Sequence, residues 1–196
     1  MTAVTPKRIA FLVFPHLTFL DFVGGYDALR RVAGMGIDKS VSHRVIGTEA
    51  SIVDDSGLRV MPDGVYEDLA PFDLLYIPGG FGTRPLMEDT RFIEYLKTWG
   101  TERPVASVCT GALLLGRAGY LAGRRATTHH NAYDALRPFC REVVTDRRIV
   151  DEGQVVTAGG VSSSLDLGLY LVEKHWGADA RKTIAAPMVY RGYSPV

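Results

Sequence analysis

The sequence has no net charge, few cysteines and no long apolar segment, and each of these absences excludes a class of protein. Lysine and arginine together number 22, as do aspartate and glutamate. This balance argues against binding to nucleic acid and against attraction to an anionic membrane surface. No apolar run is long enough to span a membrane, and residues 1–8 lack the apolar region of a signal peptide. We therefore expect a soluble, cytoplasmic protein with neither nucleic acid nor a membrane as partner.

Metal-binding spacings are also lacking. The chain contains neither a CxxC nor an HExxH pattern. The adjacent His129 and His130 point to opposite faces if they lie on a strand, so they cannot share a metal ion. Its two cysteines, Cys109 and Cys140, are expected to be free thiols in a reducing compartment. We expect no metal site.

Short apolar runs alternate with segments of helical periodicity along the chain, which is typical of an α/β protein. At 196 residues, one compact domain over residues 1–196 is expected. The alternation predicts a single doubly wound, mainly parallel sheet with helices on both faces. We expect strands over 9–14, 41–47, 74–77, 105–108 and 125–129, hairpins over 52–60 and 149–157, and helices over 19–31, 91–99, 131–136, 163–176 and 178–186.

The segment around Cys109 predicts a sharp turn from a strand into a helix. The run 105–108 is small and β-branched, as in a buried strand, and the run 112–115 is typical of a buried helix. Only residues 109–111 lie between them, which is the spacing of a nucleophile elbow. Free N–H groups and the dipole at the amino end of a helix favour a thiolate. Cys109 is therefore the candidate nucleophile; the alternative is a small buried hydrophobic side chain.

Ligands of such sheets bind beyond the carboxyl ends of the strands, so the loops there are candidate site segments. We expect four to converge, namely 15–21, 78–82, 109–111 and 159–163. Asp21 lies in the first of them between apolar neighbours, so partial burial should raise the pKa of its carboxyl group. Asp21 is either a carboxylate that stabilises the start of a helix or a group that exchanges protons with Cys109.

Three further positions each allow a structural and a functional interpretation. The hydroxyl of Thr110 either caps a helix or donates a hydrogen bond to a substrate. The pair Gly79-Gly80 is either a plain turn or a source of N–H groups that complete an oxyanion hole with the N–H of Thr110. His129 either bonds to backbone or approaches Cys109.

Five motifs together resemble the ThiJ/PfpI superfamily over nearly the whole chain. They are Phe14-Pro15 with Asp21, Ile77-Pro78-Gly79-Gly80, Ser107-Val108-Cys109-Thr110-Gly111, the segment 121–129, and Thr157-Ala158-Gly159-Gly160 followed by Asp166. The resemblance implies the flavodoxin-like fold that class I glutamine amidotransferases share. Those amidotransferases need a distal His-x-Glu pair, which His175-Trp176-Gly177 does not supply.

The pairing of Asp21 with Cys109-Thr110 is similar to the isocyanide hydratase branch. Deglycase and glyoxalase branches usually carry a glutamate after the first strand, and the peptidase-like branch has a histidine directly after the cysteine. The resemblance implies a cysteine-dependent lyase, homodimeric and without a dissociable cofactor, that hydrates a small isocyanide to an N-substituted formamide. It implies attack by Cys109 to give a thioimidate, with Asp21 as general acid and base. The substrate would be positioned by Thr110 and by N–H groups near Gly79, Gly80, Gly160 and Val161.

Two alternatives remain open. The Cys-Thr-Gly and Ala-Thr-Thr-His segments also resemble the sensing domains of AraC-type regulators. Because no helix-turn-helix follows before Val196, we expect a stand-alone small-molecule or redox sensor rather than a DNA-binding regulator in that case, with Cys109 oxidised to a sulfinate. Glyoxalase or deglycase activity on reactive carbonyls is the other alternative.

Overall fold

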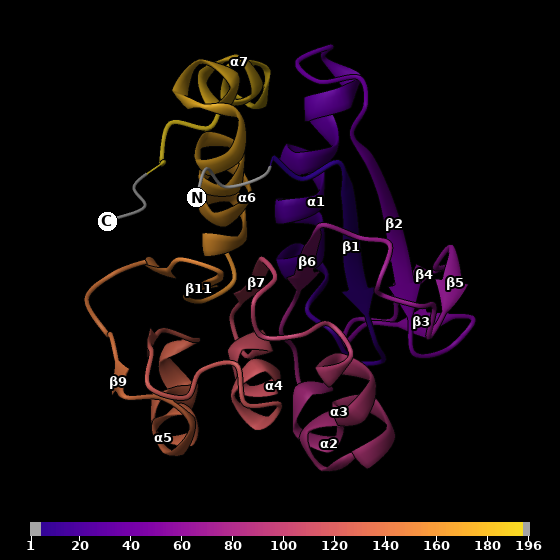
Figure 1. Cartoon of the computed structure of the whole chain (residues 1–196), viewed down its shortest axis with the longest axis vertical. Coiled ribbons are helices and arrows are strands. Elements are labelled where there is room, and N and C mark those ends of the chain that lie inside the picture. The colour runs from indigo at the N-terminus through magenta and orange to yellow at the C-terminus, as the bar shows by residue number, and fades with distance from the viewer. Residues whose placement is uncertain (1–4, 194–196) are drawn as a thin grey trace.

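A seven-stranded sheet forms the centre of the computed structural model, which describes residues 5–193 (Figure 1). Its strands run in the order β10-β11-β7-β6-β1-β2-β5. All neighbours pair in parallel except β10 and β11, which form an antiparallel hairpin. The strands are β1 (Arg8–Val13), β2 (Ser42–Gly47), β5 (Gly64–Val65), β6 (Leu74–Ile77), β7 (Val105–Val108), β10 (Ile149–Glu152) and β11 (Val155–Ala158).

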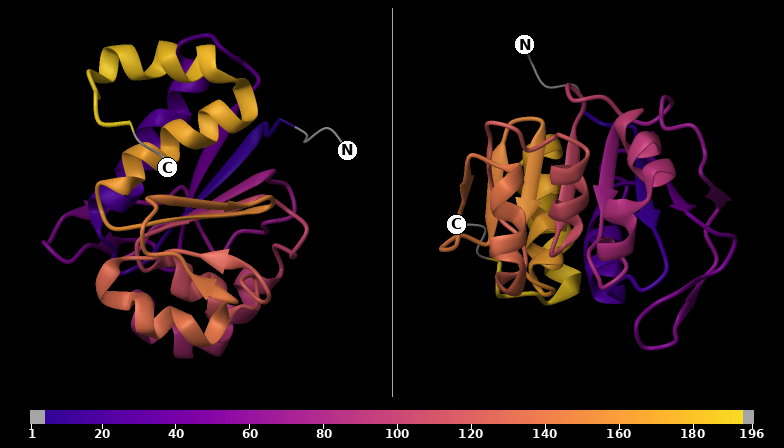
Figure 2. Two further views of the ribbon diagram at one scale, coloured as in Figure 1. Left: turned by 90° about the vertical axis from the view of Figure 1, so that its left-hand side faces the viewer. Right: turned by 90° about the horizontal axis from the view of Figure 1, so that it is seen from below.

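Helices cover both faces of this sheet, as the alternating pattern predicts (Figure 2). One face carries α1 (Phe19–Gly34), α6 (Ser163–Trp176) and α7 (Ala178–Met188). The other carries α2 (Thr83–Glu88), α3 (Thr90–Lys97), α4 (Gly111–Arg117) and α5 (Tyr133–Leu136), with short 3-10 turns at His130–Ala132 and Arg137–Phe139. Among residues 5–193, no helix combines the length and the apolar character needed to cross a lipid bilayer.

The central strands are apolar along their whole length because both of their faces are covered. Every residue of β6 and β7 is buried, and β1 is exposed only at Arg8. Burying one large apolar side chain contributes roughly 1.5–3 kcal/mol, so these strands anchor the core. The polar Ser107 and Thr157 are buried with them, and Thr157 Oγ1 accepts a hydrogen bond from the N–H of Thr127 at 2.9 Å.

Helices α1 and α6 cross at close range over the sheet. A Cβ atom on Gly168 of α6 would lie 2.8 Å from the Cβ of Ala28 and 3.0 Å from the Cα of Gly25, both in α1. Only glycine permits this approach. The crossing matters for the site because the first turns of both helices lie at the carboxyl end of the sheet.

Strand order reverses between β1 and β6. From β1 the chain continues to β2 on one side, and it later returns to add β6 on the other side. The loops after β1 and β6 therefore begin at this switch point, where ligands of such folds bind. They are joined by hydrogen bonds from the N–H of Thr18 to the carbonyl oxygen of Gly79 at 2.9 Å and from the N–H of Gly82 to that of His16 at 3.0 Å. The loop after β7 contacts both of these loops, through Thr110 with Gly80 and through Cys109 with Asp21.

The structure differs from the expected elements in several places. The strand expected over 125–129 is shorter, because β8 (Arg125–Ala126) pairs only with β9 (Glu142–Val143) in a separate small sheet. Residues 127–128 instead bond to side-chain and backbone groups near the site. Neither α2 nor β5 was expected, since both are short and α2 contains Pro85. The 52–60 hairpin is confirmed as β3 (Ile52–Val53) and β4 (Arg59–Val60).

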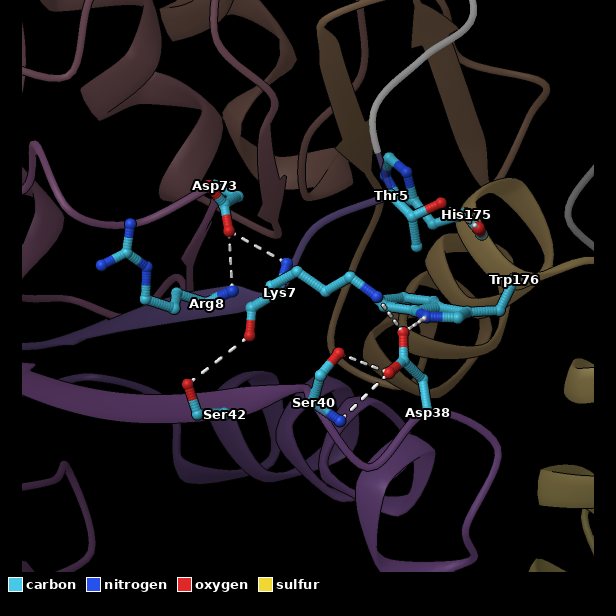
Figure 3. Close-up of polar contacts among 9 residues, drawn as sticks. All are labelled: Thr5, Lys7, Arg8, Asp38, Ser40, Ser42, Asp73, His175 and Trp176. Atoms are coloured by element: carbon cyan, nitrogen blue, oxygen red, sulfur yellow. Dashed lines mark hydrogen bonds and ion pairs between the residues drawn. The ribbon is translucent and has the colours of Figure 1, made fainter.

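The opposite, amino end of the sheet is closed by a polar network (Figure 3). The Asp73 carboxylate accepts hydrogen bonds from the N–H groups of Lys7 and Arg8 at 2.9 and 2.8 Å. Asp38 accepts from Lys7 Nζ at 2.5 Å and from Trp176 Nε1 at 3.4 Å. These contacts join the start of β1 to the end of α6, at the far end of that helix from the loop that follows β11.

Candidate active site

Cys109 lies on the expected sharp turn between β7 and α4. Its φ angle is +54°, a left-handed conformation that is uncommon for a residue other than glycine. Its N–H is directed at the carbonyl oxygens of Ala158 and Gly159, at 3.0 and 2.9 Å. Its own carbonyl oxygen accepts a hydrogen bond from Thr128 Oγ1 at 2.7 Å. A strained residue of this kind persists only where its surroundings over-determine it, and strain of this kind clusters at functional sites.

Asp21 lies in the first turn of α1 and is fully buried. Its Oδ2 atom accepts a hydrogen bond from the N–H of Gly79, in the turn after β6, at 3.1 Å. Its Oδ1 atom is buried without a well-formed hydrogen bond among residues 5–193, and its side chain interacts with that of Cys109. Asp21 is therefore not a simple helix cap, because the hydrogen bond to its carboxyl group comes from the turn after β6 and not from its own helix.

Burial governs the acidity of both side chains. Desolvation raises the pKa of the Asp21 carboxyl from 3.8 to about 7, while the Cys109 thiol and the Gly79 N–H oppose part of the rise. The raised pKa expected from its apolar flanks is thus confirmed. Desolvation, followed by the nearby Asp21 charge, raises the pKa of the Cys109 thiol to about 12.

The expectation that the helix terminus favours a thiolate is wrong for the resting site. Cys109 is only 5% exposed, and loss of water around the sulfur outweighs the help from the N–H and hydroxyl of Thr110. At neutral pH the site holds a thiol beside a carboxyl group whose pKa of about 7 lies far above that of an exposed aspartate.

The hydroxyl of Thr110 binds the turn after β6 and does not cap α4. Thr110 Oγ1 accepts from the N–H of Gly80 at 2.9 Å and donates to the carbonyl oxygen of Gly80 at 3.0 Å. The N–H groups of Gly79 and Gly80 are thereby occupied by Asp21 and Thr110, so the oxyanion hole expected from them is not available in this arrangement. A Cβ atom on Gly79 would lie 2.6 Å from Thr110 N and 2.8 Å from Cys109 Cβ, so only glycine fits.

Gly160 and Val161 lie in the loop between β11 and α6. Their N–H groups make no hydrogen bond within the described part of the chain, unlike those of Gly79 and Gly80. The carbonyl of the preceding Gly159 accepts from the N–H of Cys109, which places this loop against the elbow. Of the four expected backbone donors at residues 79, 80, 160 and 161, the last two are therefore free to bind a substrate. Their role in binding a substrate stays a prediction.

His129 binds backbone and lines a groove beside the site. Its Nδ1 atom accepts a hydrogen bond from the N–H of Asn131 at 3.2 Å, and its ring packs on Gly160, where a Cβ atom would approach Cδ2 to 2.8 Å. Burial, His130 and Arg84 lower the pKa of His129, so the ring is neutral at pH 7. Among the described residues, this ring forms no hydrogen bond with the sulfur of Cys109. The structural interpretation accounts for its contacts, and a catalytic role stays a prediction.

An open groove of about 610 Å³ adjoins the elbow. Its lining includes Leu20, next to Asp21, together with Thr128 and Gly159, both of which bind the backbone of Cys109. Another cavity, of about 590 Å³, lies at the amino ends of β6 and β7, far from this chemistry. Residues 5–193 contain no cluster of three or more histidine, cysteine or acidic side chains that could hold a metal ion.

Sequence reasoning missed two residues that hold the pair in place. The hydroxyl of Tyr76, fully buried in β6, donates to the carbonyl oxygen of Asp21 at 2.8 Å. Thr128 bonds to Cys109 as described above. A polar side chain inside an otherwise apolar strand was the available signal for Tyr76, because a buried hydroxyl needs a partner.

This arrangement can exchange a proton between sulfur and carboxyl group at neutral pH in a site nearly closed to water. A thiol of high pKa is a poor nucleophile until a base removes its proton. The neighbouring carboxyl group, with its pKa near 7, is suited to that transfer and to the reverse one.

Comparisons with known proteins find similar sequences and a similar fold. The family model described as DJ-1/PfpI matches residues 7–174. The isonitrile hydratase of Pseudomonas putida is 34% identical over 189 residues, covering 96% of this chain and 80% of that protein. The HTH-type transcriptional regulator CdhR of Pseudomonas aeruginosa is 29% identical over 170 residues, 85% of this chain but 50% of the regulator. A crystal structure of a ThiJ/PfpI family protein from Pseudomonas syringae superposes with a TM-score of 0.84 at 27% identity, covering 99% of this chain and 79% of that chain.

Proposed function

The chain belongs to the DJ-1/PfpI family, and from this premise we propose that it is an isocyanide-hydratase-like enzyme. The reaction is the addition of water to an isocyanide, R–N≡C, to give the formamide R–NH–CHO. Cys109 is the nucleophile and Asp21 is the general acid and base. The similarity to isonitrile hydratase suggests the substrate class, and the Cys109–Asp21 pair supplies the chemistry.

The observation that carries the proposal is a fully buried carboxyl group of pKa about 7 that interacts with the Cys109 thiol. A general acid and base works best when its pKa lies near the operating pH, since both of its forms are then populated. Surface carboxylates, with pKa values near 4, are almost entirely ionised at pH 7 and make poor acids. Burial beneath the loops that follow β1 and β6 thus gives Asp21 the acidity that a two-way proton transfer requires.

In the first half of the reaction, the sulfur of Cys109 bonds to the terminal isocyanide carbon. The ionised Asp21 takes the thiol proton as the S–C bond forms, and then delivers it to that carbon, which carries the electron pair. The product is the thioimidate R–N=CH–S–Cys109, formed without a leaving group. Because the carboxyl group is ionised again after this transfer, it is ready to act as a base.

In the second half, water attacks the thioimidate carbon. Asp21 removes a proton from the water and returns it to the nitrogen, and the tetrahedral species R–NH–CH(OH)–S–Cys109 collapses. The C–S bond breaks, the hydroxyl proton passes to the sulfur through Asp21, and the formamide leaves. Thiol and carboxylate are regenerated, so one water is consumed for each isocyanide.

Backbone donors beside the sulfur support both halves. The N–H of Thr110 interacts with the Cys109 sulfur. The N–H groups of Gly160 and Val161 are the free donors for a reacting nitrogen or oxygen, and Thr110 keeps the turn at Gly80 in place through its hydroxyl. The R group would extend into the open groove beside Leu20 and His129.

Steady-state turnover of p-nitrophenyl isocyanide tests the proposal. Wild type is expected to produce the formamide, and both Cys109→Ala and Asp21→Ala are expected to lose at least about a hundredfold in kcat, the usual scale of a general acid or base. Cys140→Ala is the matched control, since Cys140 is the other free thiol and lies away from the elbow. Reduced wild type that produces no formamide would refute the proposal. Activity that survives Asp21→Ala would retain the nucleophile and remove the acid–base role.

The similarity to CdhR supports a second candidate, a small-molecule or redox sensor. The chain spans about half of that regulator's length, so the regulator's activity as a whole does not transfer to it. Intact-mass analysis after peroxide treatment separates the candidates. Selective oxidation of Cys109 that changes the protein's binding properties in the absence of turnover would favour the sensor. Consumption of methylglyoxal with no isocyanide turnover would favour glyoxalase chemistry instead.

We also propose that residues 1–196 form one domain and that two copies associate. Exposed apolar side chains lie beside the site, with Leu20 44% and Phe81 71% exposed, and a second copy would cover them. Light scattering at micromolar concentration should give the mass of a dimer. A stable monomer would contradict this part of the proposal.

A further inference from the structure

An ion pair between a partly exposed arginine and a buried aspartate connects the start of β10 with the first turn of α6. Arg148 precedes β10, and its Nε and Nη2 atoms lie 2.7 and 2.5 Å from Oδ2 of Asp166. Asp166 is fully buried, and its Oδ1 atom accepts a hydrogen bond from the hydroxyl of Tyr190 at 3.1 Å. Both oxygens of the carboxylate are therefore held by other parts of the chain.

Arg148 also holds the loop that leads into α6. Its Nη2 atom donates to Ser162 Oγ at 3.3 Å, and its carbonyl oxygen accepts from the N–H of Gly159 at 2.9 Å. The carbonyl of the same Gly159 accepts from the N–H of Cys109 at 2.9 Å. One residue thus contacts the loop at both ends, and a continuous series of hydrogen bonds runs from the ion pair to the elbow.

We propose that Arg148 and Asp166 are positioning residues that hold the 159–162 loop against the Cys109 elbow. The loop in turn fixes the backbone of Cys109 in its left-handed conformation and keeps the sulfur enclosed beside Asp21. It also presents the N–H groups of Gly160 and Val161, which are free donors among the described residues. The link to catalysis rests on the proposed function, but the link to the thiol does not.

Stability alone is a poor reason for this pair. The Asp166 carboxylate is taken fully out of water, and that desolvation offsets much of what its attraction to the partly exposed Arg148 contributes. What such a pair does supply is directionality. The planar guanidinium binds Asp166 and Ser162 in one fixed geometry, which a methionine or leucine would not provide.

The reactivity of the Cys109 thiol toward iodoacetamide, followed against pH, tests the proposal without any isocyanide. In Asp166→Asn the loop should loosen and water should reach the sulfur. Because exclusion of water is the main cause of the raised pKa of Cys109, alkylation near pH 8 should become about tenfold faster, equivalent to about one pKa unit. Asp21 is the charged group that acts on this thiol, and it is unchanged in the variant.

Asp151→Asn is the matched control. Asp151 accepts hydrogen bonds from Lys174 Nζ at 2.6 Å and from the hydroxyl of Tyr170 at 2.7 Å. Like Asp166 it therefore binds one cation and one tyrosine, but its two partners lie toward the other end of α6. Both variants should lower the melting temperature. Only Asp166→Asn should change the pH profile of Cys109 alkylation, whereas a purely structural pair would leave the profile of the folded protein unchanged.

Two milder variants keep the test decisive if Asp166→Asn does not fold. Ser162→Ala removes one contact to the loop, and Arg148→Lys keeps the charge but loses the planar fork. Each should accelerate alkylation by less than Asp166→Asn would, in the same direction. Wild-type profiles in both, or equal changes in Asp151→Asn, would overturn the proposal. Failure of the wild type to hydrate isocyanides would refute the proposed function and leave this test intact.

Discussion

Replacing Asp21 by asparagine should stabilise the protein, and increasingly so as the pH rises. The folded-state pKa of Asp21 is about 7 against 3.8 for an exposed aspartate, so folding favours its protonated form. The stability associated with that form is fully present below pH 3.8 and is lost as the pH rises through 7. Asparagine mimics the protonated carboxyl group in shape, can still accept from Gly79, and never ionises.

The size of the effect follows from the two pKa values. Between about pH 5 and about pH 8, ionisation of Asp21 should cost the wild type about 2.5 kcal/mol that Asp21→Asn does not lose. For a protein of this size, 1 kcal/mol shifts the melting temperature by roughly 2–4 °C, so the variant should gain about 5–10 °C on the wild type over this range.

Urea denaturation of both proteins at the two pH values measures the difference. Histidines that titrate in the same range, such as His129 and His175, contribute equally to both proteins and cancel in the comparison. Asp27→Asn is the matched control, since Asp27 is a partly exposed acid in the same helix. A gain in Asp21→Asn that does not depend on pH would refute the assignment of a raised pKa.

Three further outcomes are expected. The kcat/KM for isocyanide should rise tenfold per pH unit below about 7 and level off above it, because the reaction begins with ionised Asp21. A flat kcat/KM profile from pH 5 to 9 would contradict this. Gly79→Ala should abolish turnover, since its Cβ would lie 2.6 Å from Thr110 N, and near-wild-type activity would show that the turn has room. Thr110→Val should cost about 1–3 kcal/mol in urea denaturation by leaving the buried Gly80 N–H unpaired, and an unchanged midpoint would mean that this bond is dispensable.

The fold and the position of the site could be predicted from the sequence because their signals are local. Apolar runs of four to six residues mark β1, β6 and β7 directly, and the spacing between 108 and 112 leaves room only for a sharp turn at Cys109. Once parallel strands are inferred, convergence of the loops that follow them is a geometric consequence. The contact of Asp21 with Gly79 bears this out.

Acidity and hydrogen-bond partners could not be predicted in the same way, because they depend on tertiary packing. A helix terminus favours a thiolate, but the sequence does not show that Cys109 is 5% exposed, and desolvation is the larger effect. The sequence also does not show that the N–H groups of Gly79 and Gly80 are occupied, the first by the carboxylate of Asp21 and the second by the hydroxyl of Thr110. Arg148 lay in a polar stretch with nothing to indicate that it reaches a buried carboxylate eighteen positions later.

The central claim is that Cys109 forms a covalent thioimidate, and rapid-quench mass spectrometry tests it most directly. Protein mixed with a ¹³C-labelled aryl isocyanide and quenched in acid should gain the full mass of the isocyanide, because addition releases no leaving group. The label should lie on the peptide that contains Cys109, and it should be absent in Cys109→Ala. Formamide production by wild type with no adduct on Cys109 at any quench time, or undiminished formamide production by Cys109→Ala, would contradict the account.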